Sequence, residues 1–176
     1  MNEKVAMGVT LGIMVGLVIC VILFRFANKD KRIKTQYDER QEVIRGRGYR
    51  FGFYTMLFLE VVLMMAKMAG LVFPIEEYLI HMVTILIGTL VICIHSIWNG
   101  VYWGINNDHK RYYIIFIVAI VLNLIPVASS LAHSTIATKG FDSLPMLNVL
   151  VLIWMAVIGI TALVKKLVDS VNKEED

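Results

Sequence analysis

Residues 78–99 read YLIHMVTILIGTLVICIHSIWN, a run that contains no Asp, Glu, Lys or Arg. An α-helix needs roughly 20 mostly apolar residues to cross a ~30 Å hydrocarbon layer, and this run is long enough to do so. Similar runs lie on either side of it, near residues 5–26, 51–73, 112–133 and 146–167. The sequence therefore predicts a single membrane domain, an all-α integral membrane bundle of five transmembrane helices.

The composition supports this class. Hydrophobic residues make up 58% of the 176-residue chain, well above the usual share in a soluble domain. Both cysteines, Cys20 and Cys93, fall inside predicted spans. We therefore interpret them as small packing residues and not as partners in a disulfide.

The basic residues predict the orientation. When the five runs are threaded alternately through a bilayer, nearly all of the 17 Lys and Arg residues fall on one side. Only Lys4 and Lys139 fall on the other side, and Lys67 falls inside a run. Cytoplasmic loops carry the excess of Lys and Arg, so we expect a multi-pass cell-membrane protein with its N-terminus outside and its C-terminus in the cytoplasm. The run 5–26 is too long for a signal peptide, so we expect it to remain a span.

The longest polar segment, residues 27–50, predicts a short cytoplasmic amphipathic linker helix. Thr35 or Asp38 could cap this helix, and Gly46 and Gly48 would loosen the backbone before the next span. Its basic side chains would contact anionic lipid headgroups or a cytoplasmic regulator protein, or they would only set the orientation. The residues expected to make such a contact are Lys29, Lys31, Arg32, Lys34, Arg40, Arg45, Arg47 and Arg50.

Three glycines in the first run, Gly8, Gly12 and Gly16, are four residues apart and share one helical face. Small residues at this spacing let a second helix approach closely. The second helix could belong to the same chain or to another copy of it, in a homo-oligomer. The sequence does not separate these alternatives.

Two charged residues, Glu60 and Lys67, fall inside the predicted second span. Such residues are costly in hydrocarbon and normally face protein or water. Counting residues inward from the span ends places Glu60 level with Asn123 and Lys67 level with His81. We expect these four residues to form a polar interior. It could be structural, with Glu60 hydrogen-bonded to Asn123, or it could bind a small polar ligand, an ion or a proton.

Other site chemistry is weak in this sequence. His95 and Cys93 could supply two metal ligands, but no third or fourth ligand is apparent, so we expect no metal. The sequence shows neither a phosphate-binding glycine loop nor a nucleophile elbow. We therefore expect no catalytic residue, no cofactor, no enzyme activity and no direct contact with nucleic acid.

The segment Tyr37–Gln41 (YDERQ), followed by Ile44, Gly46, Gly48 and an aromatic-rich span, carries a resemblance. It resembles small, poorly characterised multi-span membrane proteins of Gram-positive bacteria, which have an Asp-Glu-Arg element before a membrane helix. Their genes often neighbour a small helix-turn-helix regulator, which implies a sensor, antirepressor or immunity role. The resemblance covers about a quarter of the chain and implies no catalytic residue.

These observations favour a non-enzymatic bacterial membrane protein that acts as a sensor or regulator through its basic linker. One alternative is a small transporter or channel subunit that acts as an oligomer, with Glu60, Lys67 and Asn123 along its pathway. Another is a self-immunity protein against a membrane-active peptide.

Overall fold

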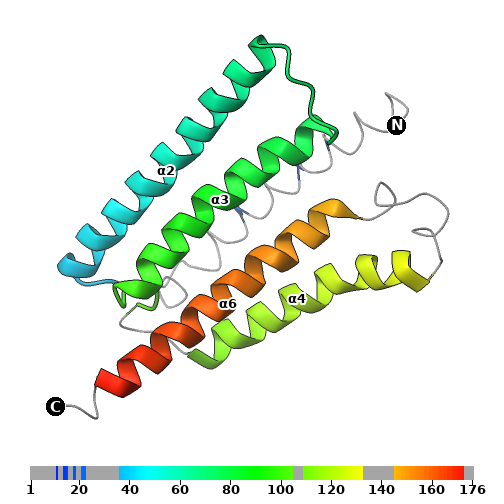
Figure 1. The fold of residues 1–176 in the computed structure, drawn as a ribbon. Helices are drawn as coiled ribbons and strands as arrows, with labels where there is room; N and C mark the ends of the chain where they lie inside the picture. Colours follow the sequence, from blue (N-terminus) through cyan, green and yellow to red (C-terminus); the bar gives the residue numbers. More distant parts are fainter. Residues whose placement is uncertain are drawn as a thin grey trace. The chain divides into compact units, whose positions relative to one another are not determined.

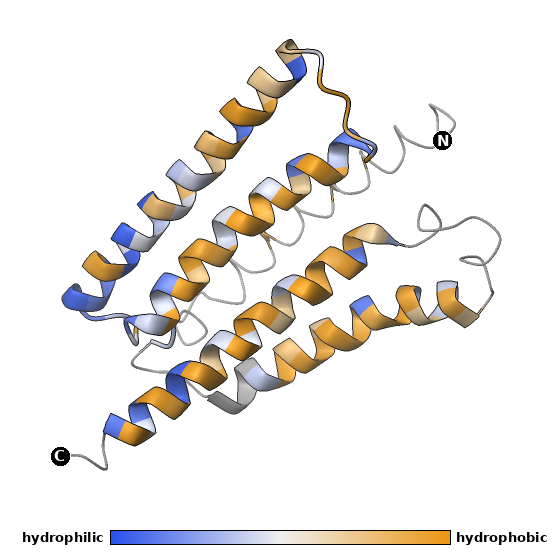
Figure 2. Cartoon of the chain, in the orientation of Figure 1, coloured by the Kyte–Doolittle hydropathy of each residue, from blue (hydrophilic) through white to orange (hydrophobic). Residues whose placement is uncertain are grey.

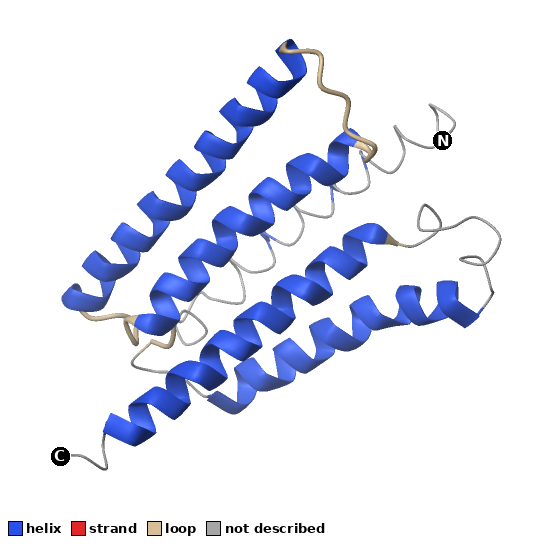
Figure 3. Cartoon of the chain, in the orientation of Figure 1, coloured by secondary structure: helices blue, strands red, loops and turns tan. Residues whose placement is uncertain are grey.

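The computed structural model describes residues 36–104, 109–132 and 145–172, together with Leu11, Met14, Val15, Val18, Val21 and Ile22. The chain forms two compact units, Met1–Gln36 and Tyr37–Asp176. The second unit contains the helices α2 (Glu39–Met68), α3 (Glu77–Trp98), α4 (His109–Ala132) and α6 (Met146–Asn172) (Figure 1). Within these ranges the chain has helices and loops but no strand (Figure 3). The prediction of an all-α protein is confirmed.

All four helices are long and apolar enough to cross a membrane. Apolar residues run along most of their length, and hydrophilic residues gather at the N-terminal end of α2 (Figure 2). Many large apolar side chains face outward, for example Phe58 and Leu163, which fits surfaces covered by lipid. These helices are consistent with the predicted membrane protein. Most of the predicted span 5–26, with Gly8, Gly12 and Gly16, lies outside the described residues.

Helix α2 corrects the prediction for the basic segment. We expected a separate linker helix and a flexible entry at Gly46 and Gly48, but one helix of 30 residues runs through both glycines. Asp38 starts it with a capping box: its side chain accepts a hydrogen bond from the Gln41 backbone at 2.6 Å, and the Gln41 side chain accepts one from the Asp38 backbone. Asp38, one of the two predicted alternatives, is therefore the N-cap of α2. Thr35, the other alternative, is not among the described residues.

Two glycines of α2, Gly48 and Gly52, lie close against α3, whereas a Cβ at Gly46 would meet nothing within 4 Å. A Cβ added at Gly52 would lie 2.6 Å from the carbonyl oxygen of Gly88 on α3, and one added at Gly88 would lie 2.1 Å from Met56. Gly48 likewise faces the His95 ring. Since only a residue without a side chain fits at such distances, the glycines let the two helices approach closely. This explains why the helix tolerates residues of low helix propensity.

Helices α2 and α3 end in the same way. Gly70 and Gly100 follow their last turns with φ of +79° and +67°, a left-handed conformation that favours glycine. After α2, the backbone N–H of Leu71 donates to the Ala66 carbonyl and that of Gly70 to the Lys67 carbonyl; the same pattern follows α3. This is the Schellman motif, and it ends α2 at Met68, before the predicted residue 73.

The helix contacts follow the order α2–α3–α6–α4. Helices α2 and α3 are antiparallel, since Gly48 faces His95 near one end and Lys67 meets Glu77 at the other. Helix α6 joins α3 through the Trp154 indole, which donates to the Leu86 carbonyl at 3.0 Å. Lys165, near the end of α6, lies above the ring of Trp98, the last residue of α3. The N-terminal end of α2 and the C-terminal ends of α3 and α6 therefore lie at the same end of this unit.

Candidate functional site

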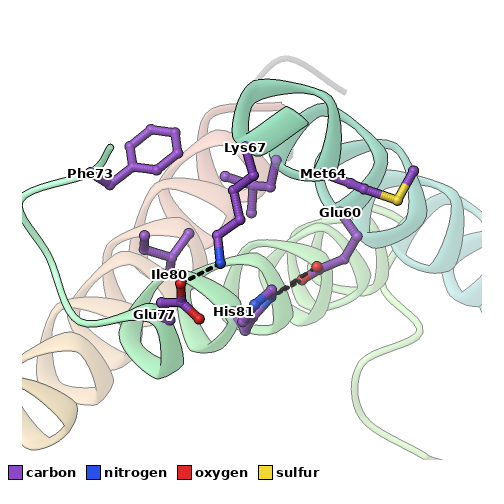
Figure 4. Close-up of a pocket in the computed structure, with 8 residues that line it drawn as sticks. Glu60, Met64, Lys67, Phe73, Glu77, Ile80 and His81 are labelled. Atoms are coloured by element: carbon purple, nitrogen blue, oxygen red, sulfur yellow. Dashed lines mark hydrogen bonds and ion pairs between the residues drawn. The ribbon is translucent and has the colours of Figure 1, made fainter. Parts of the chain in front are cut away.

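The main polar contact between the packed helices joins α2 to α3. Nδ1 of His81 lies 2.9 Å from Oε2 of Glu60 (Figure 4). The Thr84 hydroxyl donates a hydrogen bond to Oε1 of the same carboxylate. His81 and Thr84 are three residues apart on α3 and so share the face that meets α2. Thr84 is buried, with 4% of its surface exposed. Both carboxylate oxygens of Glu60 are thus satisfied from the neighbouring helix.

A second charged contact lies nearer the α2–α3 turn. Nζ of Lys67, in the last turn of α2, is 2.6 Å from Oε1 of Glu77, the first residue of α3 (Figure 4). Both side chains are partly exposed. Lys67 follows Glu60 by two helical turns, so the two contacts lie along one face of α2. Together they form a ladder of charged and polar pairs on one side of a tightly packed helix pair.

A cavity of about 180 Å³ opens between these two contacts. Its lining consists of four ionisable and four apolar residues: Glu60, Lys67, Glu77, His81, Leu63, Met64, Phe73 and Ile80. Two carboxylates, one ammonium group and one imidazole face this cavity. Carboxylate oxygens attract protons and small cations, which are therefore the occupants that this lining fits best. We call these eight residues and Thr84 the Glu60 site.

Asn123 does not belong to the Glu60 site. Its carbonyl oxygen accepts a hydrogen bond from Nδ2 of Asn148 at 3.1 Å, and its own Nδ2 donates to the Ala119 carbonyl. The expected contact between Glu60 and Asn123 is therefore wrong. Matching depths along single helices ignores which helices are neighbours, and α4 packs on α6 while α2 packs on α3. Of the four residues predicted to form a polar interior, the structure brings Glu60, Lys67 and His81 to one cavity.

Two partners were not identified from the sequence. Thr84 was overlooked because threonine is common in membrane helices, although its spacing from His81 was a usable signal. Glu77 lies directly before the run 78–99, one helical turn before His81. Either could have been found by asking which polar residues of the segment 77–99 share a face with His81.

His95 and Cys93 are the two residues that the sequence offered as possible metal ligands. Nδ1 of His95 is buried and has no hydrogen-bond partner within the described part of the chain, and the ring packs 5.5 Å from that of Phe51. Cys93 is a half-buried free thiol. The described ranges contain no group of three or more His, Cys, Asp or Glu residues placed to hold a metal ion. His95 here is a packing residue against Gly48.

The described basic residues of the predicted contact surface lie in the first turns of α2. Arg45 is held locally: its guanidinium group lies 3.7 Å from the centre of the Tyr37 ring and donates to the Tyr49 hydroxyl at 2.8 Å. Arg40, Arg47 and Arg50 occur on the same helix. The other predicted members, Lys29, Lys31, Arg32 and Lys34, lie outside the described residues.

Aromatic rings gather at the same end of this unit. Tyr102 and Trp103 follow α3 with ring centres 4.9 Å apart, and Trp103 lies 6.3 Å from Tyr113 of α4. Lys165 of α6 lies 5.9 Å above the Trp98 ring. Trp and Tyr are the residues that concentrate at the membrane–water interface of membrane proteins.

Comparisons of this chain with protein-family models, with curated proteins and with solved structures find no match. Function must therefore be inferred from the chain's own chemistry. A carboxylate in contact with an imidazole can hold or exchange a proton, and its charge can attract a cation. Ionisable side chains inside a helix that spans a membrane are candidates for a functional site.

Proposed function

We propose that this protein is a non-enzymatic bacterial membrane sensor or regulator, in which α2 couples the Glu60 site to the basic surface at the start of the helix. One observation supports this most strongly: α2 is unbroken from Glu39 to Met68. At ~1.5 Å per residue its 30 residues span about 45 Å. Arg40 and Arg45 near one end and Glu60 and Lys67 toward the other therefore belong to one rigid element.

A cation or proton that enters the cavity would compete for the carboxylates of Glu60 and Glu77. If it displaced His81 from Glu60, or Lys67 from Glu77, the polar interaction between α2 and α3 would weaken. The close approach at Gly52 and Gly88 would then guide α2 along α3 instead of letting it separate. The two positions of α2 on α3, before and after this movement, would be two packed states of the protein. A ligand that binds one state better than the other changes their populations.

The proposed arrangement in the membrane has five spans, with residues 5–26 as the first, the N-terminus outside and the C-terminus in the cytoplasm. Arg40–Arg50 of α2 and Lys165 and Lys166 of α6 lie at one end of the helical unit, which the positive-inside rule makes cytoplasmic. The basic surface, which among the described residues consists of Arg40 and Arg45, would bind an acidic face of a cytoplasmic regulator protein. The basic residues 29–34, which are predicted to join in this contact, lie outside the described residues. The resemblance to Gram-positive membrane proteins with adjacent regulator genes agrees with such a partner.

Coupling is tested by measuring whether the Glu60 site moves the start of α2. Spin labels in place of Arg40 and Lys166 report the distance between the ends of α2 and α6 in vesicles. Glu60→Gln should shift this distance distribution, because the variant removes the charge that attracts a proton or cation. Glu76→Gln is the matched control, since Glu76 makes no side-chain capping bond and does not line the cavity. An unchanged distribution in Glu60→Gln contradicts the proposal.

The partner is tested separately by affinity recovery from cross-linked native membranes. Reversing the charge of residues 29–45 should abolish recovery of the cytoplasmic partner while membrane insertion stays intact. Lys166→Glu changes the charge at the same end of another helix and should leave recovery unchanged. Undiminished recovery after the reversal rules out this surface.

The cavity favours one alternative, a small transporter or channel subunit that completes its pathway as a homo-oligomer. Four ionisable side chains around about 180 Å³ within the span could line a route for protons or cations. Purified protein in vesicles discriminates the two functions. Flux that is lost in Glu60→Gln but kept in Glu76→Gln supports transport, and no flux across a panel of cations supports the regulator.

A further inference from the structure

Two arginines at the start of the membrane-embedded part of α2 are free to bind an anion. Arg47 and Arg50 are three residues apart, on one helical face, and line a cavity of about 260 Å³ with Phe51 and Tyr54. Arg45 is engaged with Tyr37 and Tyr49, but neither Arg47 nor Arg50 has an ion pair among the described residues. Two unpaired guanidinium groups thus share one surface hollow.

An apolar groove continues from this hollow along the outside of the helix pair. It has a volume of about 520 Å³, shares Phe51 and Tyr54 with the first hollow, and extends past Thr55, Phe58 and Leu59 to Ile87 of α3. Phe58 is 67% exposed and Tyr54 62% exposed, so neither ring is covered by the described helices. The two hollows form one continuous surface, cationic at one end and apolar along the rest. We call it the Arg47–Phe58 groove.

The dimensions of the groove match one leaflet of a bilayer. From Arg47 to Phe58 the helix rises by about 16 Å, close to half of a ~30 Å hydrocarbon layer. Its cationic end lies opposite His95, near the end of α3, where Trp98 and the following rings mark the headgroup level. The apolar end therefore lies at the depth of acyl chains.

We infer that the Arg47–Phe58 groove binds one anionic phospholipid, with its phosphate between Arg47 and Arg50 and an acyl chain along Phe51, Tyr54 and Phe58. Guanidinium groups pair with phosphate oxygens through charge-assisted hydrogen bonds. A purely apolar occupant, such as another membrane helix, would leave the two charges unpaired. The inference goes beyond the proposed function: it uses neither the Glu60 site nor the surface around Arg40 and Arg45.

The headgroup half is tested by native mass spectrometry of the purified full chain titrated with dioleoylphosphatidylglycerol or dioleoylphosphatidylcholine. The protein should retain one phosphatidylglycerol molecule more tightly than phosphatidylcholine. Arg47→Gln and Arg50→Gln should each weaken the phosphatidylglycerol affinity about fivefold, the effect of one basic group near an anionic surface. Lys166→Gln removes one positive charge at the same end of α6 and should leave the affinity unchanged.

The binding of the acyl chain is tested with two phenylalanines of α2. Phe58 lines the groove, whereas Phe53 is similarly exposed but lies outside it. Phe58→Ala should weaken phosphatidylglycerol binding and Phe53→Ala should not. Inorganic phosphate should compete poorly, because it lacks the chain. Competition by phosphate at the affinity of the lipid would show a simple anion site and would overturn the inference.

A photo-reactive amino acid in place of Tyr54 identifies the occupant in native membranes. Cross-linking to phospholipid supports the inference, and cross-linking to residues 1–36 or to another protein overturns it. The inference is also overturned if Arg47→Gln and Lys166→Gln lose binding equally, or if the protein shows no preference for the anionic lipid. Arg47→Lys and Arg50→Lys keep the charge and should retain most of the binding. If they bind the lipid and the Gln variants do not, the loss is due to the missing charge and not to misfolding.

Discussion

The α2–α3 pair and the α4–α6 pair are held together by different chemistry. Helices α2 and α3 meet through glycines at near-backbone distance and through the Glu60–His81–Thr84 and Lys67–Glu77 contacts. Among the described residues, α4 and α6 share one polar side-chain contact that the structure resolves, between Asn123 and Asn148. Neutral amides satisfy each other at little cost in a membrane, whereas carboxylates there are expensive. The two pairs therefore differ in kind: carboxylates take part in the α2–α3 contacts, whereas neutral amides form the α4–α6 contact.

The largest effect is expected from breaking the glycine contact of the α2–α3 pair. Gly88→Leu would place its side chain against Met56 and the Gly52 backbone, and such overpacking costs about 1–3 kcal/mol. Thermal unfolding in detergent, followed by circular dichroism, should show a clear loss of stability. Gly159→Leu on α6 is the matched control because a Cβ there meets nothing within 4 Å. If both variants unfold alike, the close approach of α2 and α3 is not what stabilises the pair.

A smaller effect is expected from the charged and polar contacts of the same pair. Glu60→Gln keeps an acceptor for the Thr84 hydroxyl but loses its charge toward His81, so it should destabilise less than Gly88→Leu. The effect of Glu60→Gln should depend on His81. In a protein that already carries His81→Phe, adding Glu60→Gln should lower the free energy of unfolding by less. A double-mutant cycle on unfolding measures this coupling. Strictly additive effects of the two changes would indicate that the contact contributes no stability.

The α4–α6 pair should respond more weakly. Asn123→Leu or Asn148→Leu alone leaves the other amide without its partner and should cost about 1 kcal/mol. The double variant removes both polar groups and should be closer to wild type than the sum of the single changes predicts. Unfolding in the same detergent checks this. Full additivity would mean that the two side chains do not pair.

The smallest effect is expected at a partly exposed pair outside both interfaces. Nζ of Lys165 lies 2.5 Å from Oδ1 of Asp169 one turn later on α6. Such pairs on a helix surface contribute about 0.3–0.5 kcal/mol, and salt screens them. Asp169→Asn should therefore shift the unfolding midpoint slightly at low salt and not at high salt. A large, salt-independent shift would point to a role for Asp169 in packing.

Much of the helical layout could be predicted because it is encoded locally. The apolar run 78–99 predicted α3 to within one residue at each end, and Asp38 was one of two predicted caps. The prediction of a flexible entry at Gly46 and Gly48 was wrong, because one helix runs through both glycines. A Cβ at Gly46 would meet nothing within 4 Å, but Gly48 lies opposite His95 of α3. Opposite a second helix, the same absent side chain permits close contact, which local sequence does not reveal.

The sequence by itself determined the all-α class, the approximate positions of the apolar helices and the polar residues inside them, because burial of about 20 apolar residues in lipid depends only on consecutive residues. Only the tertiary structure decided that Glu60 meets His81 and Thr84, that Lys67 meets Glu77, and that Asn123 pairs with Asn148. Helices that are apolar on every side have no preferred neighbour in lipid from hydrophobicity alone. Their partners are chosen by small residues and by matching polar groups far apart in the chain.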